Sequence, residues 1–121
     1  MKKFQLLTFA CIICACFSSH AEDYEHSKGL PAETLEQALE NYDVYNQKLS
    51  DMLAQELTPE SMHEIHMLSY TLENALERIE HALDQHQEDL ETVHKASEHM
   101  KADKVIEYGQ KYLETSNALR Q

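Results

Sequence analysis

Apolar residues recur at helical spacing along most of the chain after residue 34. In the first stretch they occupy the a, d and e positions of a seven-residue repeat, namely Leu35, Ala38, Leu39, Tyr42, Tyr45, Leu49, Met52 and Leu53. Such a stripe is typical of an amphipathic helix that buries one side. We expect this helix to begin near Pro31–Thr34, because proline suits a first helical turn and the segment from Thr34 to Gln37 fits a capping box, and to end near Leu57.

A second, longer helix is predicted from residue 60 to residue 102. Thr58-Pro59-Glu60 combines a hydroxyl N-cap, a proline at the first helical position and an acid in the positive first turn. No Gly or Pro interrupts the segment, and one apolar row runs at spacings of seven through Ile65, Leu72, Ile79, His86, Val93 and Met100, with a second row of Leu76, Leu83 and Leu90 beside it. The constant phase indicates a single helix of about 40 residues. The polar residues 85–89 leave open a break near residue 87.

A last helix is expected from Lys104 to Leu119, with Asp103 as its cap. The fold class is therefore all-α, and two architectures are consistent with the lengths. In one, the first and last helices fold back as antiparallel, coiled-coil-like hairpins along the two halves of the long central helix. In the other, the long helix breaks near residue 87 and the chain forms a four-helix bundle. The elongated form buries little surface per chain and so predicts a homodimer.

The N-terminal 21 residues have the pattern of a secretory signal peptide. Lys2 and Lys3 precede an apolar run from Phe4 to Phe17, and Ser19-His20-Ala21 offers small residues for cleavage after Ala21. The run of about 14 residues is shorter than the roughly 20 that span a bilayer, so we expect no stable membrane span after cleavage. A lipoprotein anchored through Cys16 is the alternative. Residues 22–31 are expected to form a flexible segment, and residues 32–121 a single helical domain.

Composition and charge narrow the function once cleavage is considered. The chain carries 22 acidic and 10 basic residues, a net charge of −12. Loss of Lys2 and Lys3 leaves eight basic residues and a net charge of −14, and all three cysteines leave with the signal. Such an acidic protein is unsuited to binding nucleic acid or anionic lipid, and without cysteine it has no thiol chemistry.

Histidine is the one unusual chemical resource. Seven histidines follow the predicted cleavage site, and His63 and His66 are three residues apart on one helix face. Two imidazoles at this spacing can chelate a divalent metal, with Glu60 as a carboxylate ligand, although a solvated polar face is the simpler interpretation. His86 falls on the apolar stripe, where it is either a core histidine or a haem ligand. No catalytic motif is present, and we expect no enzyme activity.

Several segments in the same order resemble a family of small exported bacterial helical proteins, a domain of unknown function. They are KGLPAETLEQAL (28–39), YNQKLSDML (45–53), LTPESMHEIHMLSYTLENALERI (57–79), VHKASEHM (93–100) and GQKYLETS (109–116). The resemblance implies an all-helical fold and a bacterial envelope location, and no activity. We therefore expect an exported, periplasmic, non-enzymatic protein that acts by binding a protein partner or itself. The alternatives are a periplasmic metal- or haem-binding protein and a small envelope stress chaperone.

Overall fold

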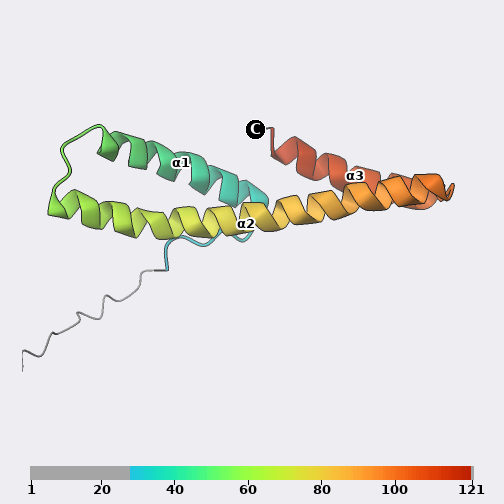
Figure 1. Ribbon diagram of the computed structural model, residues 1–121, viewed down its shortest axis with the longest axis horizontal. Helices are drawn as coiled ribbons and strands as arrows, with labels where there is room; N and C mark the ends of the chain where they lie inside the picture. Colours follow the sequence, from blue (N-terminus) through green and yellow to red (C-terminus); the bar gives the residue numbers. More distant parts are fainter. Residues whose placement is uncertain (1–27, 121) are drawn as a thin grey trace, which may run out of the picture.

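The computed structural model describes residues 28–120, and this part of the chain contains three α-helices and no strand. The helices are α1 (Leu35–Leu53), α2 (Pro59–Glu98) and α3 (Ala102–Ala118). Figure 1 shows α1 folded back along the N-terminal half of α2 and α3 folded back along its C-terminal half. The start of α1 and the end of α3 both lie near the middle of α2. The prediction of an all-α fold is confirmed.

The long helix is continuous, so the predicted alternative of a break near residue 87 is wrong. The segment holds no Gly or Pro, and its 40 residues keep one phase of packing from end to end. Among residues 28–120, none of the helices combines the length and the hydropathy needed to cross a membrane. The predicted signal peptide, its cleavage site after Ala21 and the Cys16 alternative all lie outside the described residues.

Capping residues fix where α1 and α2 begin. The Thr58 hydroxyl accepts from the Ser61 amide at 3.2 Å, and the Ser61 hydroxyl accepts from the Thr58 amide at 2.9 Å, which completes a capping box. At α1, the Thr34 hydroxyl accepts from the Gln37 amide at 3.2 Å, but the Gln37 side chain accepts from Glu33 rather than from Thr34. Both predicted helix starts are therefore confirmed, while the box at Thr34 is only half formed.

The turn between α2 and α3 begins earlier than the periodicity predicts. Met100, expected to continue the apolar row, has φ 54° and is 89% exposed. The Lys101 amide donates to the Ala96 carbonyl at 2.9 Å and closes the helix end. The N-cap of α3 is Lys101, so the prediction that Asp103 caps this helix is wrong; Asp103 lies in the first turn, where its charge suits the helix dipole.

Small side chains form the seam between the helices. The buried positions of α2 that repeat every seven residues are Leu68, Ala75, Ala82, Asp89 and Ala96. On α1 the buried residues are Leu35 and Ala38, and no large side chain in the described part of the chain is fully buried. Because alanine lets helix backbones approach closely, α2 contacts its neighbours through this row. The two apolar rows of the long helix that the sequence shows at spacings of seven lie to one side of this seam.

Candidate functional site

A strap of residues 28–34 precedes α1 and lies against α2. The Leu30 amide donates to the Thr71 hydroxyl at 3.0 Å. The side-chain amide of Asn74 donates to the carbonyls of Lys28 and Leu30 at 2.7 and 2.9 Å. Thr71 is itself buried. These bonds tie the strap to α2 over residues 28–30.

Gly29 makes this close approach geometrically feasible. Its φ of 64° lies in the left-handed region, and a Cβ added there would meet the Thr71 nitrogen and the Tyr70 carbonyl carbon at 2.7 Å. Any side chain at this position would push the strap away from α2. The flexible segment predicted over residues 22–31 thus requires a correction, because its last four residues are tethered to a helix.

The strap also contacts α1, so it crosses one side of the α1–α2 pair. The Asn41 side chain donates to the Pro31 carbonyl at 3.2 Å, and the Arg78 guanidinium donates to the Glu33 carbonyl at 3.1 Å. No pattern in the sequence predicts this arrangement directly. The available signals were a glycine two residues before Pro31 and polar residues that interrupt the α2 pattern.

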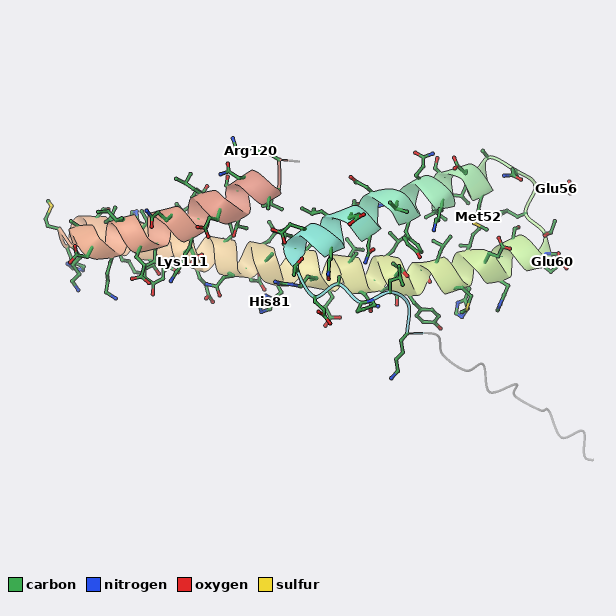
Figure 2. All side chains as sticks on the ribbon, turned by 180° about the vertical axis from the view of Figure 1, so that it is seen from behind. Met52, Glu56, Glu60, His81, Lys111 and Arg120 are labelled. Carbon is green, nitrogen blue, oxygen red and sulfur yellow. The ribbon has the colours of Figure 1, made fainter. Side chains whose placement is uncertain are left out.

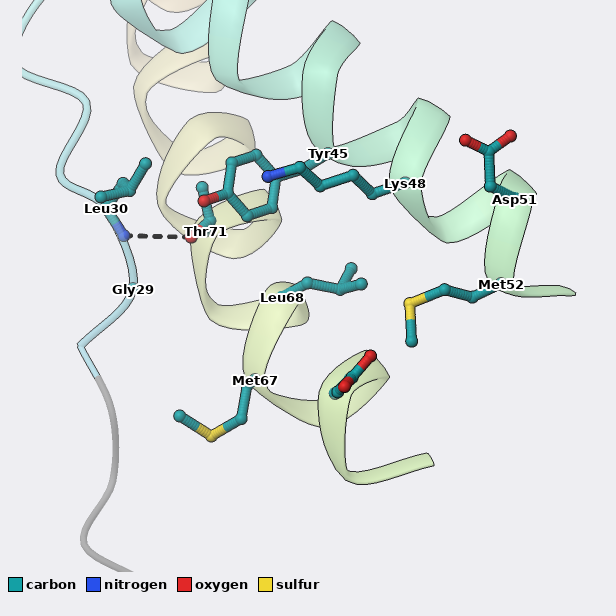
Figure 3. Close-up of a pocket in the computed structure, with 10 residues that line it drawn as sticks. Gly29, Leu30, Tyr45, Lys48, Asp51, Met52, Met67, Leu68 and Thr71 are labelled. Carbon is teal, nitrogen blue, oxygen red and sulfur yellow. Dashed lines mark hydrogen bonds between the residues drawn. The ribbon is translucent and has the colours of Figure 1, made fainter. Parts of the chain in front are cut away.

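An open groove of about 680 Å³ lies between the strap, α1 and α2. Its lining combines apolar side chains from all three segments with a few charged ones: Gly29, Leu30, Tyr45, Lys48, Asp51, Met52, Glu64, Met67, Leu68 and Thr71. Figure 3 shows Met52 and Leu68 pointing toward each other across this space. In Figure 2, Met52 lies between the two helices close to the loop that joins them. We call this the strap groove.

The charges at the strap groove are mostly acidic. Asp51 and Glu64 line it, while the single lysine, Lys48, has its ammonium 4.2 Å from the centre of the Tyr45 ring. This cation–π contact places the Lys48 charge over an aromatic face of the same helix. The groove therefore offers an apolar floor with two carboxylates at its edge.

The opposite side of the three helices carries a second feature, an uncovered apolar face. Each of its members comes directly after a buried or half-buried residue in the sequence. Leu76, for example, comes after Ala75, and Leu113 comes after Tyr112. These exposed side chains are Leu53, Met62, Leu76, Leu83, Leu90, Ile106 and Leu113. The second apolar row of the long helix, Leu76, Leu83 and Leu90, belongs to this face, and its side chains are 50, 46 and 47% exposed.

Helix geometry separates this face from the strap. Asn74, which holds the strap, and Leu76 are two residues apart, or about 200° around a helix. The helices α1 and α3 run antiparallel to α2. In an antiparallel pair, the residue that follows a seam residue by one position points to the same side of the pair on both helices. The apolar face therefore continues across all three helices on the side away from the strap.

The structure does not assemble the predicted metal ligands. Over residues 28–120, no group of three or more His, Cys, Asp and Glu side chains is arranged to hold a metal ion. The His66 ring accepts or donates a hydrogen bond with the Tyr70 hydroxyl at 3.1 Å and packs edge-on against its ring. A site that uses His63, His66 and Glu60 stays a prediction, which elemental analysis of the purified protein would test.

Glu60 has a structural role at the start of α2. A hydrogen bond from its own backbone amide, and then one from Thr58, lower the pKa of its carboxyl group. The pKa of Glu36 at the start of α1 is lowered in the same way, first by its own backbone amide and then by Thr34. Both carboxylates accept hydrogen bonds from backbone amides of the first helical turn, which have no carbonyl partner within the helix.

Polar groups enter the seam between α2 and α3 at one place. The rings of His86 and Tyr112 stack with centroids 4.1 Å apart and an interplanar angle of 3°, and the buried Nδ1 of His86 has no hydrogen-bond partner within residues 28–120. One turn away, the buried Asp89 carboxylate accepts from the Gln85 side chain at 3.2 Å. His86 is thus a seam residue packed on tyrosine, as one of the two predicted interpretations has it.

The fold and these surfaces define an elongated all-α protein in which two antiparallel helical hairpins share one central helix. The chain belongs to a family of unknown function (DUF6746), whose model matches residues 1–121. The resemblance to an uncharacterised family is thereby confirmed. No curated protein and no solved structure matches the chain.

Proposed function

We propose that this protein is an exported, non-enzymatic binding protein of the bacterial envelope, and that the strap groove binds short amphipathic, basic segments of other polypeptides. The observation that carries the proposal is the composition of the groove. Apolar side chains of Met52, Met67 and Leu68 form its floor, and the carboxylates of Asp51 and Glu64 lie at its edge. Methionine side chains adapt their shape to different apolar partners, which suits a site that binds varied sequences.

Size and charge support this class of ligand. A groove of about 680 Å³ is of the scale that holds a few side chains rather than a folded surface. Lys and Arg side chains bury their apolar stems and keep their charged ends at an edge, which matches an apolar floor beside two carboxylates. The net charge of −12 favours the approach of basic segments over acidic ones. Export through the predicted signal peptide would place the protein among unfolded envelope polypeptides, as the chaperone alternative requires.

The test is a fluorescence-anisotropy titration of the full chain with two labelled helical peptides. One peptide has leucine at helical spacing with lysine elsewhere, and its counterpart has glutamate in place of lysine. We expect the basic peptide to bind and the acidic one not to bind. Equal binding of both peptides, or of neither, would contradict the proposal.

Substitutions localise the binding. Met67→Lys introduces a like charge into the groove and should weaken binding of the basic peptide at least about tenfold. Gln110→Lys is the matched control, since it makes the same charge change at an exposed position on α3. If both variants lose the same affinity, net charge and not the strap groove governs binding.

A further inference from the structure

The apolar face is large for a surface that nothing covers. Its seven members are large hydrophobic side chains, each of them 46–60% exposed. Their exposed parts together amount to roughly several hundred Å², and apolar patches of that size mark interaction sites. The strap lies on the other side of α2 and leaves this face open.

We propose that a second copy of this chain covers the apolar face, in an antiparallel dimer whose two-fold axis passes near Ile79. The half-buried row beside the face runs from Ile65 to Val93, and its midpoint is Ile79. α2 spans residues 59–98, so the same residue lies at the centre of the helix. A two-fold axis there brings Val93 of one copy to the partner's Ile65 and Leu76 to the partner's Leu83, while Leu90 lies opposite the partner's Ser69.

The dimer supplies the core that one chain lacks. A single chain is two helices thick at any point along α2, and its buried seam consists largely of alanine. Placing the apolar faces of two copies together gives four helices in cross-section, with large side chains from both copies in the middle. Standard protein interfaces bury about 800 Å² on each partner, so the polar side chains that border the apolar face must also contribute to the contact.

Charge argues for a second copy over an anionic lipid surface. The chain carries a net charge of −12, and Glu73 and Glu80 lie on the position next to the exposed leucines of α2. Phosphate-rich surfaces repel such a rim. The leucine row itself carries no charge, so two copies can join it without burying an unpaired ion. Repulsion between their rims is screened by salt, so dimerisation strengthens as ionic strength rises.

Sedimentation equilibrium of the full chain tests the proposal at micromolar concentration. We expect the mass of a dimer, and we expect Leu83→Glu to raise the dissociation constant at least about a hundredfold because it buries a charge in each copy. Val44→Glu is the matched control: Val44 is 45% exposed, close to the 46% of Leu83, but it lies on the α1 side that carries the strap. Circular dichroism checks that both variants keep their helices.

A monomeric wild type overturns the proposal, as does a Leu83→Glu variant that still dimerises. Equal loss of dimer in the Val44→Glu control would show that the face is not specific. Orientation is tested with a photoreactive amino acid in place of Val93. Crosslinks to the region of the partner's Ile65 support the antiparallel dimer, and crosslinks to the partner's Val93 contradict it.

Discussion

Replacing Gly29 by alanine tests how the strap is held on α2. Alanine disfavours the left-handed conformation by about 1–2 kcal/mol, and Gly29 has φ 64°. In addition, the new Cβ would lie 2.7 Å from backbone atoms of Tyr70 and Thr71, a distance that neither backbone can accommodate without a shift. The strap must therefore move away from α2 locally.

The movement removes hydrogen bonds whose lengths are near 3 Å. The Leu30 amide loses the Thr71 hydroxyl, and the Asn74 side chain loses the carbonyls of Lys28 and Leu30. Each such bond contributes about 1 kcal/mol net. Since a displaced strap also relieves the backbone strain, the two effects do not add fully. We expect Gly29→Ala to lower the free energy of unfolding by about 2–3 kcal/mol.

Urea unfolding followed by circular dichroism measures this loss, and Gly109→Ala provides the control. Gly109 lies inside α3, and an added Cβ meets nothing within 4 Å. The same substitution there should raise stability by up to about 1 kcal/mol, because alanine is the better helix former. A Gly29→Ala variant as stable as the wild type would refute the close contact between Gly29 and the backbone of α2. Slowed exchange of the Leu30 amide in the wild type, lost in Gly29→Ala, would locate the effect.

Three further predictions concern the helices. Thr58→Ala should lower the free energy of unfolding by about 1 kcal/mol, because it removes the capping box of α2. Thr58→Ser keeps the hydroxyl and should retain most of the wild-type stability. Equal stability of the wild type and both variants would contradict this role. Asp89→Ala should raise the melting temperature, because among residues 28–120 the buried carboxylate accepts a hydrogen bond from Gln85 and is attracted to Lys111 without a direct ion pair; a lower melting temperature would show that this attraction outweighs the cost of burial. Acidification should lower the urea midpoint between about pH 5 and pH 3, because folding lowers the pKa of several glutamates. Each of them stabilises the folded protein above its pKa in the unfolded chain, and this stabilisation is lost as the pH falls through its pKa in the folded protein. A urea midpoint that does not change with pH would refute this. These glutamates are Glu36, Glu60, Glu91 and Glu107.

Periodicity and capping signals predict the three helices and the starts of α1 and α2, but they place the end of α1 near Leu57 instead of Leu53 and assign the cap of α3 to Asp103 instead of Lys101. The Thr58-Pro59 start is local chemistry, and the absence of Gly and Pro across residues 60–98 accounts for one uninterrupted helix. The end of α2 was harder to predict. Met100 continues the apolar spacing, yet the chain turns there, because the left-handed conformation at Met100 depends on the closing bond from Lys101 to Ala96.

The packing face was predicted less well because a wide apolar arc does not reveal which residues form the seam. Large side chains such as Leu76 and Leu83 dominate a hydropathy pattern, although they are about half exposed. The backbones instead approach through Ala75 and Ala82, which carry little weight in such a pattern. The strap was missed for a different reason. Its bonds join Lys28 and Leu30 to Asn74, more than forty residues away, and no local pattern encodes a contact at that separation.

The two surfaces have a joint consequence, because they lie on opposite sides of the same helix. Polar side chains of Thr71 and Asn74 hold the strap on one side of α2, and exposed leucines such as Leu76 leave the other side free for a second copy. A dimer joined through the apolar face therefore keeps both strap grooves on its outer surfaces, accessible and facing away from each other. Two weak sites on one rigid body bind a long or multivalent partner more tightly than either site alone. Under the two proposals, Leu83→Glu should leave the affinity for a single short peptide unchanged and weaken only the binding of a tandem peptide long enough to reach both grooves.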